Sequence, residues 1–293
     1  MRVFVTGATG FIGTAVVKEL IDAGHQVLGL TRSEQGAVAL TAAGAEPHRG
    51  SLEDLDSLAS GAAASDGVIH LAFNHDFTNW QAHSEHDRTV IATLGAALAG
   101  SDRLLIVTSG TAAAITPGRP TTEQDAPNSP IPRVATEEAA DAVTSKGGRV
   151  VVMRLPQVHD PLKQGLITPL IEIARAKGVS AYVGDGANRW PAGHVDDVAR
   201  LYRLALEKNV AGVRYNAVAE EGVALREIAE VIGRGLNIPV VSKTPEEAAE
   251  HFGWLGALAG VDIPATSALT REQLGWTPIG PTMIADLSKL AFV

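Results

Sequence analysis

The chain has 293 residues, a net charge of −9 and no cysteine. The lack of cysteine excludes disulfides, a cysteine nucleophile and iron–sulfur ligation, and an acidic chain without a basic patch argues against a nucleic-acid partner. No apolar run approaches the roughly 20 residues that a membrane span needs. Because residues 2–6 already have the pattern of a strand, we expect no signal peptide. We therefore expect a cytoplasmic protein with one large domain and a smaller lobe.

The first thirty residues predict the opening of a nucleotide-binding unit. Residues 2–6 are an apolar run that predicts a buried strand, and residues 26–30 predict a second one. Apolar positions at three- to four-residue spacing over 11–23 predict a helix, which Gly24 ends. This order of strand, turn, helix and strand is that of a βαβ dinucleotide-binding unit.

A glycine turn joins the first strand to the helix, where residues 6–13 are TGATGFIG. Gly7 permits the tight turn, Gly10 lets backbone N–H groups approach a pyrophosphate, and Gly13 lets the helix pack closely on the sheet. The phosphate is expected at the helix N-terminus, where N–H groups and the helix dipole favour an anion. The turn resembles the TGxxGxxG signature of the extended and atypical short-chain dehydrogenase/reductases, a group that includes nucleotide-sugar epimerases and dehydratases.

The resemblance implies an architecture for the whole chain. The fold class is α/β, with a Rossmann-type doubly wound parallel sheet of seven strands and a small C-terminal substrate lobe. The Rossmann domain is expected over residues 1–154 and 193–217, and the lobe over residues 155–192 and 218–293, in one compact unit. The site is expected between the lobe and the carboxyl ends of the strands.

The end of the second strand indicates which cofactor binds. NAD-binding chains usually place a carboxylate there for the ribose 2′-OH, but this chain has Arg32 and Ser33. A guanidinium binds a 2′-phosphate through charge-assisted hydrogen bonds, and a serine can donate a further one. The sequence therefore predicts NADP(H) in preference to NAD(H); the alternative is an ordinary surface arginine.

The next elements continue the nucleotide-binding half. Residues 37–43 predict a helix and residues 45–48 a short strand. Ser51 fits the N-cap of a helix over 51–58, close to a capping-box pattern. The family places an Asp-Leu or Asp-Val pair at this point against the adenine, and the resemblance assigns that contact to Leu52.

Residues 67–71 predict the fourth strand, and its end resembles a family segment, H-x-A, that lies along the cofactor. The resemblance assigns residues 71–73 to that role. We interpret His70 as a partly buried strand histidine rather than as a catalyst.

The loop over residues 74–80 combines polar and aromatic residues at the carboxyl end of a strand, where open α/β sheets bind ligands. His75 and Asp76 are candidate site residues, and a solvated loop is the alternative. His75 is the leading candidate for a proton donor, because a histidine titrates nearest neutral pH.

Two later elements carry polar residues at positions that the family uses. The family holds a proton-relay water with an asparagine on the helix predicted over 81–100, and the resemblance places Asp87 there. The strand predicted over 103–108 leads to Ser109 and Thr111. These two match paired serines of the family, one of which hydrogen-bonds the substrate oxygen.

The main departure from the family follows a Pro-rich loop at residues 117–132, whose composition and place suggest a substrate-gating segment. The family expects Tyr-x-x-x-Lys, in which the tyrosine is the general acid and the lysine lowers its pKa and holds the nicotinamide ribose. Arg133 stands at the tyrosine position and Glu137 at the lysine position. The usual pair is absent, although Arg133 is suited to bind an anionic substrate or to polarise a carbonyl. None of the three tyrosines, Tyr182, Tyr202 and Tyr215, has a lysine four residues later.

Residues 149–154 predict the sixth strand, and the following RLPQVHDP segment resembles the family's L-R-x-x-N-V-Y-G-P, which passes under the nicotinamide. Pro156 and Val158 are therefore expected beside the nicotinamide ring. His159, at the tyrosine of that segment, is another candidate acid.

The rest of the chain also resembles the family. Residues 184–199 closely match a segment that ends in H-V-D-D-V-A, so Asp196 and Asp197 are expected to cap the next helix. Arg189 and Trp190, in the same stretch, are candidates to face the substrate. The remaining elements are expected as a helix over 165–177, a strand over 180–183, a last strand over 215–217 and a helix over 222–233.

Two function classes remain open, and a third is weaker. The first is an NADP-dependent oxidoreductase acting on a small carbonyl, alcohol or related molecule. The second is a non-catalytic NADP(H)-binding sensor or regulator, which the missing tyrosine and lysine favour. The third is a nucleotide-sugar epimerase or dehydratase-like enzyme. The sequence shows no metal-ligand cluster, and only the family implies a homodimer, through helices at 81–100 and 132–147.

The candidate residues fall into two sets. The candidate catalytic residues are His75, Asp87, Ser109, Thr111, Arg133 and His159. The candidate cofactor-binding residues are Gly7, Thr9, Gly10, Phe11, Ile12, Gly13, Arg32, Ser33, Leu52, Leu71, Ala72, Phe73, Thr108, Pro156 and Val158.

Overall fold

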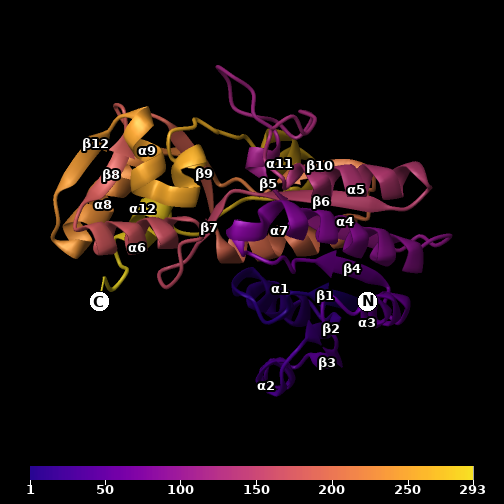
Figure 1. Ribbon diagram of the computed structural model, residues 1–293. Helices are drawn as coiled ribbons and strands as arrows, with labels where there is room; N and C mark the ends of the chain where they lie inside the picture. Colours follow the sequence, from indigo (N-terminus) through magenta and orange to yellow (C-terminus); the bar gives the residue numbers. More distant parts are fainter. Residues whose placement is uncertain (293) are drawn as a thin grey trace.

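The computed structural model describes residues 1–292. Its larger domain is built on one seven-stranded sheet in the order β10-β6-β5-β4-β1-β2-β3, and all neighbouring strands run parallel (Figure 1). The strands are β1 (Arg2–Thr6), β2 (Gln26–Thr31), β3 (Glu46–Arg49), β4 (Gly67–His70), β5 (Leu104–Gly110), β6 (Val150–Leu155) and β10 (Val213–Asn216). The chain order reverses between β1 and β4, which is the switch point at which doubly wound sheets bind ligands. The Rossmann-type sheet predicted from the sequence is confirmed.

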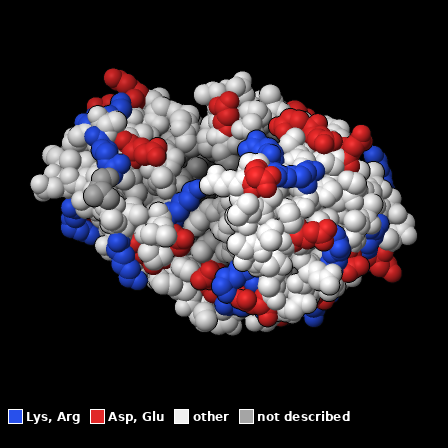
Figure 2. Space-filling view, turned by 90° about the horizontal axis from the view of Figure 1, so that it is seen from below, with Lys and Arg blue, Asp and Glu red and all other residues white. Residues whose placement is uncertain are grey.

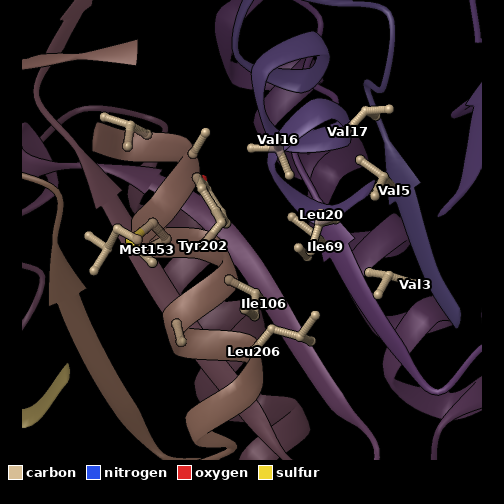
Figure 3. Packing of buried hydrophobic residues seen from close by; sticks show 14 of the residues in the cluster. Val3, Val5, Val16, Val17, Leu20, Ile69, Ile106, Met153, Tyr202 and Leu206 are labelled. Atoms are coloured by element: carbon tan, nitrogen blue, oxygen red, sulfur yellow. The ribbon is translucent and has the colours of Figure 1, made fainter. Parts of the chain in front are cut away.

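Helices cover both faces of this sheet, as buried parallel strands require. They are α1 (Phe11–Asp22), α2 (Glu34–Ala42), α3 (Leu55–Ala63), α4 (Trp80–Ala97), α5 (Val134–Ser145), α7 (Val195–Lys208) and α11 (Ala268–Leu274). On one face α1 and α7 lie side by side and meet strand residues such as Ile69 and Ile106 (Figure 3). On the other face α3, α4 and α5 pack against Phe4 and Val107. Val3 and Phe4 lie in opposite cores because side chains alternate along a strand.

The smaller lobe has its own hydrophobic core (Figure 1). Its strands are β7 (Gln157–His159), β8 (Ser180–Val183), β9 (Arg189–His194), β11 (Glu220–Ala224) and β12 (Val240–Lys243). They form a three-stranded sheet, β11-β9-β7, and a pair, β12-β8. Its helices are α6 (Ile167–Lys177), α8 (Leu225–Leu236), α9 (Pro245–Phe252), the 3₁₀ helix η3 (Gly253–Leu255), α10 (Gly256–Ala259) and α12 (Met283–Leu287). Among the helices of residues 1–292, none combines the length and apolarity that crossing a bilayer demands.

Near its end the chain returns to the larger domain. α11 packs beside α7 and β10, and Trp276 is buried in the core that α1 and α7 share. The indole Nε1 of Trp276 donates to the carbonyl of Asp197 at 3.0 Å, and the Asp197 carboxylate accepts from the backbone N–H of Gly280 at 2.7 Å. Residues 268–280 therefore pack with the Rossmann domain, although the expected lobe included them.

Two helix starts differ from the sequence prediction. The helix expected from Ser51 begins only at Leu55, because the carboxylate of Asp54 caps it by accepting from the backbone N–H of Ser57 at 3.1 Å. Residues 220–224 pair with β9 as a strand instead of opening a helix, so α8 starts at Leu225. The strand predicted over 215–217 is therefore not the last one.

A third correction concerns the cap of α7. His194 caps this helix, because its Nδ1 accepts from the backbone N–H of Asp196 at 3.3 Å. Asp196 and Asp197 occupy the first turn instead. There Asp197 ties the helix to the C-terminal segment, as described above.

The Pro-rich loop over 117–132 is held in place rather than free to gate. Thr121 exchanges backbone hydrogen bonds with Pro264 and Thr266, both at 2.9 Å. The guanidinium of Arg154 donates to the carbonyl of Asp125 at 2.8 Å. These bonds fix the loop against the segment before α11 and disfavour the gating role that its composition suggested.

Candidate active site

The glycine turn after β1 has the geometry that a pyrophosphate needs. Gly7 has φ +69°, in the left-handed region, and a Cβ on it would lie 2.8 Å from the backbone N of Ala72. A Cβ on Gly13 would lie only 1.9 Å from the carbonyl oxygen of Gly7. Gly10 is the N-cap of α1 and has no side chain to occupy the first N–H groups, which stay open to an anion. The turn therefore fits a nicotinamide dinucleotide. The same turn and the start of α1 hold Thr9, Phe11 and Ile12.

A lysine of the lobe lies over this turn. The Nζ of Lys163 is 5.5 Å from the centre of the Phe11 ring. The loop that carries it is ordered by Asp160, whose carboxylate accepts from the backbone N–H groups of Leu162 and Lys163 at 2.7 and 2.6 Å. The segment between β7 and α6 thus brings a positive charge to the start of α1.

Arg32 and Ser33 follow β2, where the adenosine ribose of a dinucleotide is expected. Arg32 is exposed, and within residues 1–292 it makes no hydrogen bond or ion pair. Ser33 caps α2, because its hydroxyl accepts from the backbone N–H of Gly36 at 3.1 Å. Leu52 is half-buried, and its carbonyl accepts from Nε2 of His86 at 3.0 Å. Among these residues, Arg32 has a side chain that is still free to bind a ligand.

A buried hydrogen-bond network lies at the carboxyl ends of β1 and β4. Nδ1 of His70 is 2.6 Å from the hydroxyl oxygen of Thr6, and Nε2 is 3.0 Å from Oδ1 of Asp87. The same hydroxyl oxygen accepts from the backbone N–H of Ala72 at 3.2 Å. A carboxylate only accepts, so Nε2 of His70 donates to Asp87. His70 is therefore a fully buried network residue, rather than a partly buried one.

Asp87 is the centre of this network. Its Oδ2 accepts from Nη1 of Arg133 at 2.9 Å and from the hydroxyl of Thr136 at 2.5 Å. Burial alone would raise the pKa of Asp87, but the charge of Arg133 and hydrogen bonds from His70 and Thr136 lower it to about 2. Asp87 is therefore ionised at neutral pH with both oxygens occupied, so it orders its neighbours and has no proton to donate.

Arg133, at the family's tyrosine position, is fixed on three sides. Besides Asp87, its Nη2 donates to the carbonyl of Thr108 at 2.6 Å. Its guanidinium lies 3.7 Å above the ring of Phe73, and 13% of the side chain is exposed. The cation is therefore held at the carboxyl edge of the sheet by α4, β5 and the loop after β4, instead of reaching freely toward a substrate.

Glu137, which the sequence predicts at the family's lysine position, is hydrogen-bonded to two arginines. Its carboxylate accepts from Nε and Nη2 of Arg154 at 2.8 and 2.7 Å, and from Nε of Arg214 at 2.8 Å. Burial would raise the pKa of Glu137, but the two arginines lower it. The lysine position is thus filled by a buried arginine–glutamate–arginine cluster that joins α5 to β6 and β10.

The end of β5 presents three hydroxyl groups with different surroundings. The hydroxyl of Thr108 donates to the carbonyl of His70 and accepts from the hydroxyl of Tyr202, both at 2.7 Å. The Ser109 hydroxyl is buried and has no hydrogen-bond partner among the described residues. Thr111 is buried at the start of the 3₁₀ helix η2 (Thr111–Ala113). Because a buried hydroxyl without a partner is costly, Ser109 is the group best placed to bind a substrate oxygen.

Asp76 shapes the loop after β4. Its carboxylate caps the 3₁₀ helix η1 (Phe77–Asn79) by accepting from the backbone N–H of Thr78 and from Nδ2 of Asn79, both at 3.0 Å. These hydrogen bonds, with one from the Thr78 hydroxyl, lower the pKa of Asp76 to about 2. Asp76 is therefore a structural carboxylate rather than a proton donor.

His75, by contrast, is exposed. Its ring is edge-on to that of Phe73, with centroids 5.4 Å apart. The atoms packed around the ring, followed by the positive charge of Arg133, lower the pKa of His75, and Lys163 adds to this effect. His75 has a hydrogen bond with the backbone of Phe73, which partly offsets the lowering of its pKa, and its side chain is otherwise exposed to a substrate.

His159 lies in a second buried cluster, at the junction with the lobe. Its Nδ1 is 3.0 Å from Oδ2 of Asp286, and its ring is edge-on to that of His194 at 5.7 Å. Burial lowers the pKa of His159, partly offset by Asp286. His159 is 1% exposed, which is the position of a structural residue and not of an accessible acid. Pro156 and Val158, just before it, are buried as well.

Sequence reasoning missed four members of the network around Asp87, namely Thr6, His70, Thr136 and Tyr202. The spacing of Arg133, Thr136 and Glu137 is a usable signal, because residues three and four apart share one face of a helix. That face of α5 is the one that meets Asp87 and Arg154. Nothing in the local sequence marks Tyr202, which comes from α7 on the other side of the sheet.

The chain matches the model of the NAD dependent epimerase/dehydratase family over residues 3–218. This span holds the glycine turn, the network around Asp87 and the whole seven-stranded sheet. It also includes β7, α6, β8 and β9 of the lobe.

Individual proteins agree with this match. The chain is 49% identical to an uncharacterized protein of Schizosaccharomyces pombe over the full length of both. It is 30% identical to 2′-dehydrokanamycin reductase of Streptomyces kanamyceticus, over 86% of this chain and 72% of that protein. The solved structure of Thermus thermophilus UDP-glucose 4-epimerase in complex with NAD has a TM-score of 0.77 at 20% identity, covering 100% of this chain and 99% of that one. At that identity the likeness shows the fold.

Proposed function

Since the chain belongs to the NAD-dependent epimerase/dehydratase family, whose members are NAD(P)-dependent enzymes, we propose that it is an NADP-dependent oxidoreductase that reduces a small carbonyl compound. The observation that carries the proposal is the Ser109 hydroxyl, buried without a partner at the carboxyl end of β5. A relative's name supports the reaction type, since 2′-dehydrokanamycin reductase is a reductase.

The bound nicotinamide would supply the hydride. The residues of the chain must then hold the carbonyl oxygen and provide a proton. The Ser109 hydroxyl is free to donate to that oxygen. Arg133 keeps its protons at neutral pH, so it can stabilise negative charge on the oxygen but cannot act as the acid.

His75 is the proposed proton donor. It is exposed, follows Phe73 by two residues and belongs to the loop that Arg133 holds. Its lowered pKa makes it a stronger acid than an ordinary imidazole, but leaves less of it protonated at neutral pH. The reduction is therefore expected to become faster as the pH falls toward that pKa.

The preference for NADP(H) rests on Arg32. Its guanidinium is exposed and unpaired within residues 1–292, at the end of the strand whose tip contacts the adenosine ribose in this fold. A free guanidinium at that point is suited to a 2′-phosphate.

The test is NADPH oxidation against a panel of aldehydes, ketones and imines. Ser109→Ala is expected to lower kcat/KM by about a hundredfold, the scale of losing one preorganised donor, with little change in NADPH affinity. Ser129→Ala is a matched control, because Ser129 is another buried serine whose hydroxyl has no partner among the described residues. Equal losses in the two variants would contradict the assignment of Ser109.

A non-catalytic NADP(H) sensor is the second candidate, and one observation favours it. Both positions at which the family keeps its catalytic pair hold residues locked in ion pairs, Arg133 with Asp87 and Glu137 with Arg154. Tight NADPH binding without turnover of any panel substrate would establish this reading. Conversion of a nucleotide sugar without net NADPH oxidation, followed by chromatography of the sugar, would instead support the epimerase or dehydratase reading, because those reactions return the hydride to the substrate.

A further inference from the structure

The loop after β4 reaches across to the lobe through two stacked rings. Phe77, in η1, and Trp254, in η3, have ring centroids 4.2 Å apart and planes within 9° of parallel. Phe77 belongs to the larger domain and Trp254 to the lobe. This pair, the aromatic bridge, therefore spans the two sides between which the site is expected.

The aromatic bridge is connected to the proposed catalytic residues by further ring contacts. The ring of His75 is 5.4 Å from that of Phe73 and 6.0 Å from that of Phe77, edge-on in both cases. Phe73 in turn carries the guanidinium of Arg133 on its face. The ring contacts lead from Arg133 through His75 to Trp254, so the bridge is packed directly beside His75.

The backbone on both sides holds the bridge in place. On the larger domain, the side chain of Asn74 accepts from the backbone N–H of Asp76, and that of Asp76 accepts from the backbone N–H of Thr78, which sets the turn that presents Phe77. On the lobe, Gly253 has φ +57° and turns the chain after α9. Leu255, directly after Trp254, is fully buried and anchors the segment in the lobe core. The position of the rings is thus built into two ordered turns.

The bridge is also able to open. Trp254 is 42% exposed, and Phe77 is half-buried. A partly exposed stacked pair contributes modestly to stability. Figure 2 shows the surface hollowed between the two parts of the molecule, so a ligand that displaces the rings would not have to unfold either core.

Two lobe residues that the sequence placed toward the substrate do not face it. Arg189, which the sequence placed toward the substrate, is bound by the Asp262 carboxylate at 3.1 and 2.9 Å. Trp190, beside it, is fully buried in the lobe core. Arg189 and Trp190 are therefore held within the lobe, and Trp254 is the lobe side chain that meets the loop after β4.

We propose that the aromatic bridge limits the size of the substrate and confines the enzyme to compact carbonyl compounds. The inference rests on the proposed oxidoreductase function. Phe77 and Trp254 act as specificity-determining residues, because they narrow the entrance beside His75 without taking part in the proton transfer.

The experiment compares small and large aldehydes with NADPH. The measured quantity is the ratio of kcat/KM for 2-naphthaldehyde to that for acetaldehyde. Trp254→Ala is expected to raise this ratio at least tenfold, since it removes one ring of the bridge. Trp254→Phe keeps a stacking ring, and Ile279→Ala alters another exposed apolar side chain; both are expected to stay within threefold of the wild type. An unchanged ratio in Trp254→Ala, or an equal rise in Ile279→Ala, would overturn the proposal.

Binding of unreactive amides separates this proposal from the function on which it rests. Calorimetry measures benzamide and 2-naphthamide binding to the NADPH-loaded protein. A tenfold gain for 2-naphthamide in Trp254→Ala, without turnover of any aldehyde by the wild type, would uphold the size limit and refute the reductase. If neither amide binds the wild type or the variant, there is no carbonyl site behind the bridge and the proposal fails.

Discussion

The glycine turn and the network around Asp87 lie at the same edge of the sheet but are built in opposite ways. The turn is one stretch, residues 6–13, in which a Cβ on Gly13 would lie 1.9 Å from the Gly7 carbonyl. The network draws on β1, β4, α4, β5 and α5 and is held by charge. Backbone contact in the turn leaves no room for a side chain. In a charged network, by contrast, residues can be replaced by others if their partners change with them.

Arg133 and Glu137, which the sequence predicts at the family's tyrosine and lysine positions, belong to two such charged groups. A cation at position 133 is neutralised by Asp87, and an anion at position 137 is neutralised by Arg154 and Arg214. A buried charge without a partner would be costly at either place. The cofactor turn could therefore be kept while the neighbouring residues were rebuilt around different charges.

The sharpest test of the network around Asp87 is Arg133→Met, which leaves the Asp87 carboxylate buried without its cation. Breaking a buried pair in this way is expected to reduce the free energy of unfolding by about 3–5 kcal/mol. Urea unfolding at pH 7 measures this loss. Arg226→Met, which removes an exposed i,i+4 partner of Glu230, is the control and should cost far less. Equal losses would show that Arg133 does not balance a buried charge.

The same pair sets a pH dependence. The pKa of Asp87 is lowered to about 2 in the folded protein, against about 3.9 in an unfolded chain. The stability contributed by its ionised form is therefore complete above about pH 4 and is lost as the pH falls toward 2. The difference between wild type and Arg133→Met should shrink over that window. A difference that stays constant down to pH 2 would contradict the assignment.

The glycine turn is tested by Gly10→Val. A Cβ on Gly10 would lie 3.2 Å from the Gly7 carbonyl, so the fold can adjust, but the valine methyl groups would fill the path of the pyrophosphate. NADPH affinity should fall at least a hundredfold while circular dichroism stays unchanged. Gly13→Val is the matched contrast, because its contact at 1.9 Å should prevent folding. A folded Gly10→Val protein that binds NADPH normally would place the phosphate elsewhere.

The difference between the two regions also decides how far the sequence could predict each. The sheet, the glycine turn and most strands were predicted because their signals are local, as in the apolar run over residues 2–6. The start of α3 at Leu55 was missed because Ser51 and Asp54 both fit an N-cap. The partners of Arg133 could not be predicted, since Asp87 lies 46 residues away and only the folded sheet brings them together.

The next prediction concerns His75, the proposed proton donor. His75→Ala should lower kcat by about a hundredfold, the usual scale for a general acid, with NADPH affinity little changed. In the wild type the rate of reduction should fall as the pH rises through the lowered pKa of His75, because the acid must be protonated. The variant should lose that limb of the pH profile. His25→Ala, a histidine of the turn between α1 and β2 that pairs with Glu207 away from the carboxyl ends of the strands, is the control. Wild-type turnover in His75→Ala would refute the assignment.

The smallest expected effect concerns Arg32, whose side chain is proposed to bind the 2′-phosphate of NADPH. Arg32 is exposed and unpaired within residues 1–292, so removing it leaves no group unsatisfied in the protein. Arg32→Ala should weaken NADPH binding by about 1.5–3 kcal/mol, the range for a hydrogen bond to a charged group, and leave NADH binding unchanged. Calorimetric titration of both cofactors measures this difference. Arg32→Lys keeps the charge but loses the planar fork, so its loss should be intermediate. Because the contact is between exposed charges, the preference for NADPH should also decrease as salt is added. Equal affinity of the wild type for NADPH and NADH would show that Arg32 is an ordinary surface residue.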